Sequence, residues 1–146
     1  MSESQFPSAE IELCAYNLLE HDIHEFRMIE GTREAADDYF DKVAAIYERA
    51  AQEKPGQRVR ILNDFTTMTL RVRITYIFQK NKEIQARRPK GMRGRVAILT
   101  PQSFLVALAQ MFIDIMPKSG GDEIHLFVGD KRQEAIAWLL REETEP

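Results

Sequence analysis

The last third of the chain alternates β-rich runs with helical runs, and this order constrains the fold more than any other feature of the sequence. Residues 95–99 and 123–128 are rich in side chains that favour strands. Residues 102–116, and the segment that follows Asp130, carry apolar side chains at helical spacing. Buried strands that alternate with helices predict an α/β domain built on a parallel sheet.

The first third of the chain predicts a β-hairpin followed by a helix. Residues 10–19 and 23–29 alternate apolar and polar side chains, and polar turn residues separate the two runs. Residues 33–52 repeat apolar side chains at helical spacing. Thr32 is placed to cap this helix, and the Lys54-Pro55-Gly56 segment is expected to end it.

The middle of the chain predicts another strand and another helix. Residues 58–65 form the strand, and an apolar stripe extends from Leu70 to about Ala86. Thr66 or Thr67 is expected to cap this second helix. Further along, Thr100 and Pro101 predict the start of the 102–116 helix, and Asp130 with Gln133 predicts a capping box for the last one. The full order is β-β-α-β-α-β-α-β-α, a mixed, mostly parallel five-stranded sheet with helices packed on it.

Composition places this chain among soluble globular proteins. With 146 residues, 44% hydrophobic and 29% charged, we expect a single domain over residues 1–146, with frayed ends at 1–8 and 142–146. The single cysteine, Cys14, cannot form an internal disulfide, and we expect it to be buried. No run is long enough to span a membrane, and the N-terminus has no signal pattern. We therefore expect a cytoplasmic protein of bacterial type.

Motifs of catalysis and cofactor binding are not found in the sequence. His21, His24 and His125 have no cysteine partner at metal-ligand spacing, so we expect no metal site. No glycine-rich phosphate loop and no nucleophile elbow occur. We expect no cofactor and no catalytic residue, and an enzyme of unrecognised type remains the third alternative for function.

The carboxyl ends of parallel strands are where ligands and partners usually bind, and here these ends are residues 63–67, 100–103 and 129–131. The strand ILNDF with its threonine-rich turn, and the closing segment VGDKRQEAIAWLL, resemble the STAS-like family, the SpoIIAA-like anti-sigma factor antagonists. The element order is similar from about residue 9 to residue 141. The resemblance implies a non-enzymatic regulatory or binding module. It places Asp64 at the strand end. The turn that follows has no counterpart of the family's regulatory serine, and Thr66, Thr67 and Thr69 are its hydroxyls open to phosphorylation.

The helix over 102–116 is apolar on almost every side, whereas a helix that covers a sheet normally buries one stripe. Three arrangements would cover its outer side: a homodimer contact, which we favour, burial by neighbouring helices of the same chain, or a bound lipid. The side chains that we expect to face a partner are Phe104, Leu108, Met111, Phe112 and Ile115.

Cations are concentrated in residues 80–95, which carry seven of them and one acid. The segment has a charge of +6 and leaves −9 for the rest of a chain whose net charge is −3. Such a lobe suits an anionic partner, and the alternative is a solvated helix end. The candidate anion-binding residues are Arg87, Arg88, Lys90 and Arg93, together with Arg71 and Arg73, which we expect early in the second helix. Nucleic acid is disfavoured because the net charge is negative and no aromatic residues are interleaved.

These observations together predict a small cytosolic regulatory or scaffold domain that acts by protein–protein binding. Its partner surface would combine the strand-end turn 63–69 with the apolar part of the third helix, residues 104–116. The alternative is a carrier of a hydrophobic or lipid-like ligand, with the basic lobe facing a membrane.

Overall fold

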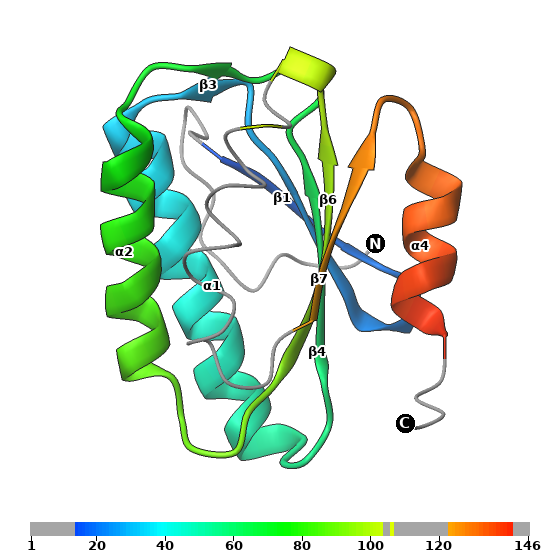
Figure 1. The fold of residues 1–146 in the computed structure, drawn as a ribbon. Coiled ribbons are helices and arrows are strands. Elements are labelled where there is room, and N and C mark those ends of the chain that lie inside the picture. The colour runs from blue at the N-terminus through cyan, green and yellow to red at the C-terminus, as the bar shows by residue number, and fades with distance from the viewer. Residues whose placement is uncertain (1–13, 104–105, 107–122, 142–146) are drawn as a thin grey trace.

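A five-stranded mixed sheet forms the centre of the computed structural model, which describes residues 14–103, 106 and 123–141 (Figure 1). The strand order is β1-β2-β4-β6-β7. β1 is antiparallel to β2, and the other neighbours are parallel. This confirms the predicted fold class. The elements are β1 (Ala15–Leu19), η1 (Glu20–Asp22), β2 (Ile23–Arg27), β3 (Glu30–Gly31), α1 (Arg33–Glu53), β4 (Val59–Asp64), β5 (Thr69–Leu70), α2 (Ile74–Arg87), β6 (Gly94–Thr100), β7 (Glu123–Val128) and α4 (Arg132–Leu140).

Helices cover both faces of this sheet. α1 and α2 lie on one face and α4 lies on the other (Figure 1). Because side chains alternate along a strand, each strand feeds both cores. Ile61 of β4 is buried in the core under α1, and its neighbour Leu62 is buried against Leu139 of α4. Ala135, Ile136, Trp138 and Leu139 hold the last helix on the sheet.

The start of α2 corrects one prediction. α2 begins at Ile74, and Thr69–Leu70 forms the short strand β5, which pairs in parallel with β3. Pairing between two loops overrides the helical pattern there: the Thr69 amide donates to the Ile29 carbonyl at 2.9 Å, and the Arg71 amide donates to the Gly31 carbonyl at the same distance. Thr66 and Thr67 therefore do not cap α2, and Arg71 and Arg73 precede the helix.

The start of α4 corrects another prediction. Lys131 occupies the N-cap position and makes no capping bond through its side chain, so the Asp130–Gln133 capping box is wrong. Gly129 adopts a φ of 82°, and its amide donates to the Thr100 carbonyl at 3.0 Å. This glycine turn places Asp130 before the cap. The predicted helix over 102–116 and both expected frayed ends lie largely outside the described residues.

Thr32 caps α1 as predicted: its Oγ1 accepts a hydrogen bond from the Ala35 amide at 3.1 Å. We expect Thr32→Ala to lower the free energy of unfolding by about 1 kcal/mol, because an amide of the first turn loses its partner. Denaturant titration measures this change. Thr75→Ala, at an exposed position of α2, is the control and should change stability by less than about 0.5 kcal/mol. Equal effects of the two substitutions would contradict the capping role.

The β1–β2 hairpin carries a half-buried histidine. The Tyr16 hydroxyl lies 2.7 Å from Nδ1 of His24, and both side chains face α1 with Phe26. Burial is the main cause that lowers the pKa of His24 to about 4. The Lys54 cation adds to this effect, which exceeds the opposing effect of Asp22.

This lowered pKa predicts how stability depends on pH. The unfolded chain takes up a proton at the ordinary histidine pKa of 6.5, before folded His24 does. The free energy of unfolding should therefore fall as the pH drops from 6.5 towards about 4. Urea midpoints at several pH values across this range test this. His24→Gln should flatten the decline, and an unchanged slope in that variant would assign the decline to other groups.

Cys14 is buried, as expected. Among the described residues, no helix is both long and apolar enough to cross a membrane.

Candidate functional site

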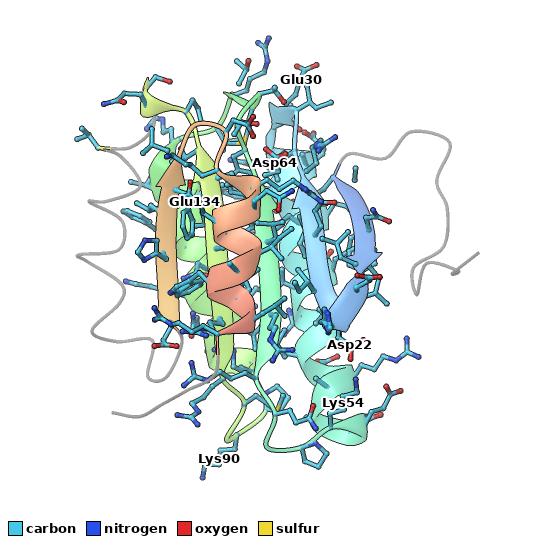
Figure 2. All side chains as sticks on the ribbon, turned by 90° about the vertical axis from the view of Figure 1, so that its right-hand side faces the viewer. Asp22, Glu30, Lys54, Asp64, Lys90 and Glu134 are labelled. Carbon is cyan, nitrogen blue, oxygen red and sulfur yellow. The ribbon has the colours of Figure 1, made fainter. Side chains whose placement is uncertain are left out.

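The loops that follow β2 and β4 come together at the carboxyl edge of the sheet. β3 and β5 join them, and the side chains of Arg71 and Glu30 form an ion pair at 2.9 Å across this junction. Glu30 and Asp64 both lie at this edge, opposite Lys54 and Lys90 (Figure 2). Ligands and partners usually bind at the carboxyl ends of parallel strands. The turn that follows Asp64 lies there and is therefore the candidate site.

Asp64 organises this turn. Its Oδ1 accepts hydrogen bonds from the Thr66 amide at 3.1 Å and from the Thr66 hydroxyl at 2.6 Å. Its Oδ2 accepts from the Arg27 guanidinium at 3.2 Å. Since an aspartate that bonds its own backbone two residues on stabilises a turn, the residue types at 64 and 66 explain the local conformation. The amide of the intervening Phe65 donates to the Leu99 carbonyl at 2.8 Å, which fixes the turn to β6.

The Asp64 carboxylate stays charged although it is only 8% exposed. Burial by itself would raise its pKa, but the two hydrogen bonds from Thr66 and the Arg27 cation together outweigh burial and hold the pKa of Asp64 below its ordinary value. A buried, ionised carboxylate that depends on a threonine and an arginine is sensitive to a change at either residue.

A second charge pair lies next to this turn. Arg132, in the first turn of α4, donates to the buried carboxylate of Glu25 in β2. The negative charge of Asp64 also acts on Arg132. Asp64 and Glu25 with Arg27 and Arg132 thus form a cluster of four charges that sum to zero, which we call the strand-end cluster. It connects the turn after β4 to the amino-terminal end of α4 (Figure 2).

Sequence reasoning found only one member of the strand-end cluster. Asp64 was predicted as the strand-end carboxylate, and its hydrogen bonds single out Thr66 among the three candidate threonines. Glu25, Arg27 and Arg132 were missed. The sequence position of Glu25 was a signal that could have indicated this cluster. Glu25 follows Ile23 by two residues, so it lies on the same buried face of the strand, and a buried acid requires a cationic partner.

The other residues predicted in this region have separate surroundings. The side chains of Thr67 and Thr69 are exposed. Arg71 is paired with Glu30, and Arg73 occupies the N-cap position of α2. The structure therefore brings Thr66 to Asp64 and leaves Thr67, the next residue, facing solvent.

The predicted basic residues lie at the opposite edge of the sheet, around the end of α2. Arg87, Lys90 and Arg93 are exposed, whereas Arg88 places its guanidinium 4.0 Å from the centre of the Tyr47 ring. Arg95, counted in the same segment, is buried and lies 4.5 Å from the Trp138 ring. Part of the basic segment therefore serves packing. The predicted partner-facing residues of the apolar helix lie outside the described residues, namely Phe104, Leu108, Met111, Phe112 and Ile115.

The strand-end cluster offers binding chemistry. Within residues 14–103, 106 and 123–141, no group of three or more histidine, cysteine, aspartate or glutamate side chains is arranged to hold a metal ion. The cluster has two carboxylates already bound by cations and one hydroxyl held against a carboxylate. Such an arrangement suits a surface whose shape changes when charge is added to it.

Comparison with known proteins adds no relative: no protein family, no curated protein and no solved structure matches this chain.

Proposed function

We propose that this protein is a cytosolic, non-enzymatic regulatory domain that binds a protein partner through the carboxyl edge of its sheet. The observation that carries this proposal is the Asp64 turn, where one carboxylate holds both the amide and the hydroxyl of Thr66. The resemblance to the STAS-like family supports it, since that resemblance implies a non-enzymatic binding module with an aspartate at this strand end.

Modification of Thr66 would act on this turn through electrostatics. A phosphate adds a charge of about −1.5 to −2 at neutral pH. On Thr66 Oγ1 it would replace a hydrogen bond to Asp64 with repulsion between two anions, in a place where Asp64 is already buried. Arg27 and Arg132 are the two cations of the strand-end cluster, and they would be drawn towards the phosphate. The turn and the start of α4 would then change together.

Quantitative affinity purification from the source organism tests this function. The bait is the full chain, compared with Asp64→Ala and Thr66→Glu, and the readout is the amount of each co-purified protein by mass spectrometry. We expect at least one stoichiometric partner whose recovery falls by about tenfold with both variants.

The matched control is Thr75→Glu, which adds the same charge at an exposed site in the first turn of α2. It should recover that partner as the unchanged protein does. If all baits recover the same proteins in the same amounts, the carboxyl edge is not the partner surface and the proposal is wrong.

A further inference from the structure

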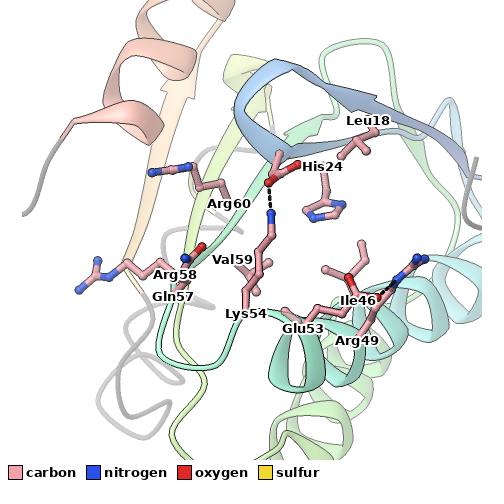
Figure 3. A pocket seen from close by; sticks show the side chains of 12 residues that line it. Leu18, His24, Ile46, Arg49, Glu53, Lys54, Gln57, Arg58, Val59 and Arg60 are labelled. Carbon is pink, nitrogen blue, oxygen red and sulfur yellow. Dashed lines mark hydrogen bonds and ion pairs between the residues drawn. The ribbon is translucent and has the colours of Figure 1, made fainter. Parts of the chain in front are cut away.

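A pocket of about 440 Å³ lies between the β1–β2 hairpin, the last turns of α1 and the start of β4 (Figure 3). This volume falls within the range of small-molecule sites, about 300–1,000 Å³. The pocket is at the amino edge of the parallel strands, far from the strand-end cluster, and the proposed function makes no use of it. Its lining side chains divide into an apolar floor and a charged rim.

The floor consists of aliphatic side chains from three elements. Leu18 comes from β1, Ile46 and Ala50 from α1, and Val59 from β4. Leu18 is 40% exposed, so part of its apolar surface is open to an occupant of the pocket. Ile46 and Val59 are already buried, so a ligand on this floor would gain mainly from covering the apolar surface of Leu18.

The rim carries more positive than negative charge. Four cations line the pocket, namely Arg49, Lys54, Arg58 and Arg60, against the acids Asp22 and Glu53. Lys54 pairs with Asp22 and Arg49 with Glu53. A third acid outside the pocket, Glu123, reaches Arg58.

One cation remains after these pairs are counted. The guanidinium of Arg60 donates to the backbone carbonyls of Leu139 and His21, at 3.1 and 3.2 Å, and these carry no net charge. The carboxyl end of α1 contributes only about half a negative charge. The loop before β6 adds further cations at this edge. It is held there because its Arg93 carbonyl accepts a hydrogen bond from the Val59 amide at 3.0 Å. The local field therefore favours an anion.

His24 supplies a neutral polar group inside the pocket. Its ring lies opposite Lys54 (Figure 3), and Nδ1 is engaged with the Tyr16 hydroxyl. Burial raises the pKa of Tyr16 to about 12, so the phenol keeps its proton at neutral pH. When the Tyr16 hydroxyl donates its proton to Nδ1 in a hydrogen bond, the neutral His24 ring carries its own proton on Nε2. Nε2 is then the nitrogen that can donate to a ligand.

We propose that this pocket binds a small organic acid, with its apolar body on the floor of Leu18, Ile46 and Val59. Its anionic oxygens lie at the Nε2 proton of His24 and at Lys54, which the ligand shares with Asp22, and the net positive charge of the rim favours them. The chemistry shared by the candidate ligands is one carboxylate or phosphate attached to a compact apolar group. This pocket is independent of the strand-end cluster, so a negative result in the binding test would not contradict the proposed function.

Nuclear magnetic resonance titration of the full chain tests the proposal, with the His24 ring and the surrounding amides as reporters. The probes share one ring and differ in head group: benzoate, phenyl phosphate, neutral benzyl alcohol and cationic benzylammonium. We expect saturable shifts with one or both anions, at least about tenfold tighter than with the alcohol or the cation. The tighter anion identifies the head group as carboxylate or phosphate.

Two variants and two matched controls locate the binding. Lys54→Gln removes the charge from an exposed ion pair, which costs little stability, and Ala50→Leu fills the pocket from α1. Both substitutions should lower the affinity of the pocket for the anion by about tenfold or more. Gln52→Leu on the same helix and Lys80→Gln in another ion pair should leave its affinity unchanged. Absence of saturable shifts at His24, equal binding of benzoate and benzyl alcohol, or unchanged affinity in Ala50→Leu would each overturn the proposal.

Discussion

Replacement of Arg132 by methionine is expected to lower the free energy of unfolding by about 3 kcal/mol, because it leaves the Glu25 carboxylate buried without its cation. The Glu25 side chain is 9% exposed, and the Arg132 side chain is 36% exposed. The partial exposure of Arg132 places the effect at the lower end of what breaking a buried pair costs. Urea or thermal unfolding followed by circular dichroism measures this loss.

Two further variants show whether this loss comes from the stranded charge. Lys131→Met removes the neighbouring cation, whose pair with Glu134 is exposed on both sides, and should cost less than about 0.5 kcal/mol. The double substitution Glu25→Gln with Arg132→Met removes both charges and should recover a large part of the stability. If Arg132→Met and Lys131→Met have the same small effect, the Glu25–Arg132 pair does not hold α4 to the sheet.

Asp64→Ala is expected to lower the free energy of unfolding by about 2 kcal/mol. The substitution removes the acceptor for the Thr66 amide, the Thr66 hydroxyl and Arg27, and hydrogen bonds to a charged group contribute most when buried. Relief of the buried charge itself offsets part of that loss. Chemical denaturation at neutral pH is the measurement.

Asp64→Asn separates the hydrogen bonds of Asp64 from its charge. The amide oxygen can still accept from Thr66, so we expect a loss of about 1 kcal/mol or less, while Asp130→Ala at an exposed position should stay within about 0.5 kcal/mol. If Asp64→Asn lowers the free energy of unfolding as much as Asp64→Ala does, the charge of Asp64 stabilises the turn and its hydrogen bonds to Thr66 do not.

Periodicity in the sequence was sufficient to predict the framework. β7 was expected over 123–128 and occupies Glu123–Val128, and the helix expected over 33–52 is α1, Arg33–Glu53. In both segments the apolar spacing favours the observed structure, and in α1 the Thr32 cap favours it as well, so local and tertiary preferences agree. The hairpin and the mostly parallel sheet followed from the same spacing.

Long-range pairing explains what sequence analysis missed. Thr69–Leu70 becomes a strand because β3, about 40 residues earlier in the chain, offers a partner, and nothing within residues 66–86 indicates this. Likewise Glu25 meets Arg132 across more than a hundred residues. Asp64 and Thr66 were within reach of sequence analysis because the turn that they form is local.

We propose that Asp64 holds the loop of residues 65–73 closed through Thr66, and that negative charge on Thr66 releases this loop. Amide hydrogen exchange of Thr69 and Arg71, which donate to the loop after β2, measures this opening directly. Thr66→Glu should speed exchange at both amides by about tenfold or more, whereas Thr67→Glu, one residue along and exposed, should leave both within about twofold. Equal exchange rates in the two variants would contradict the claim.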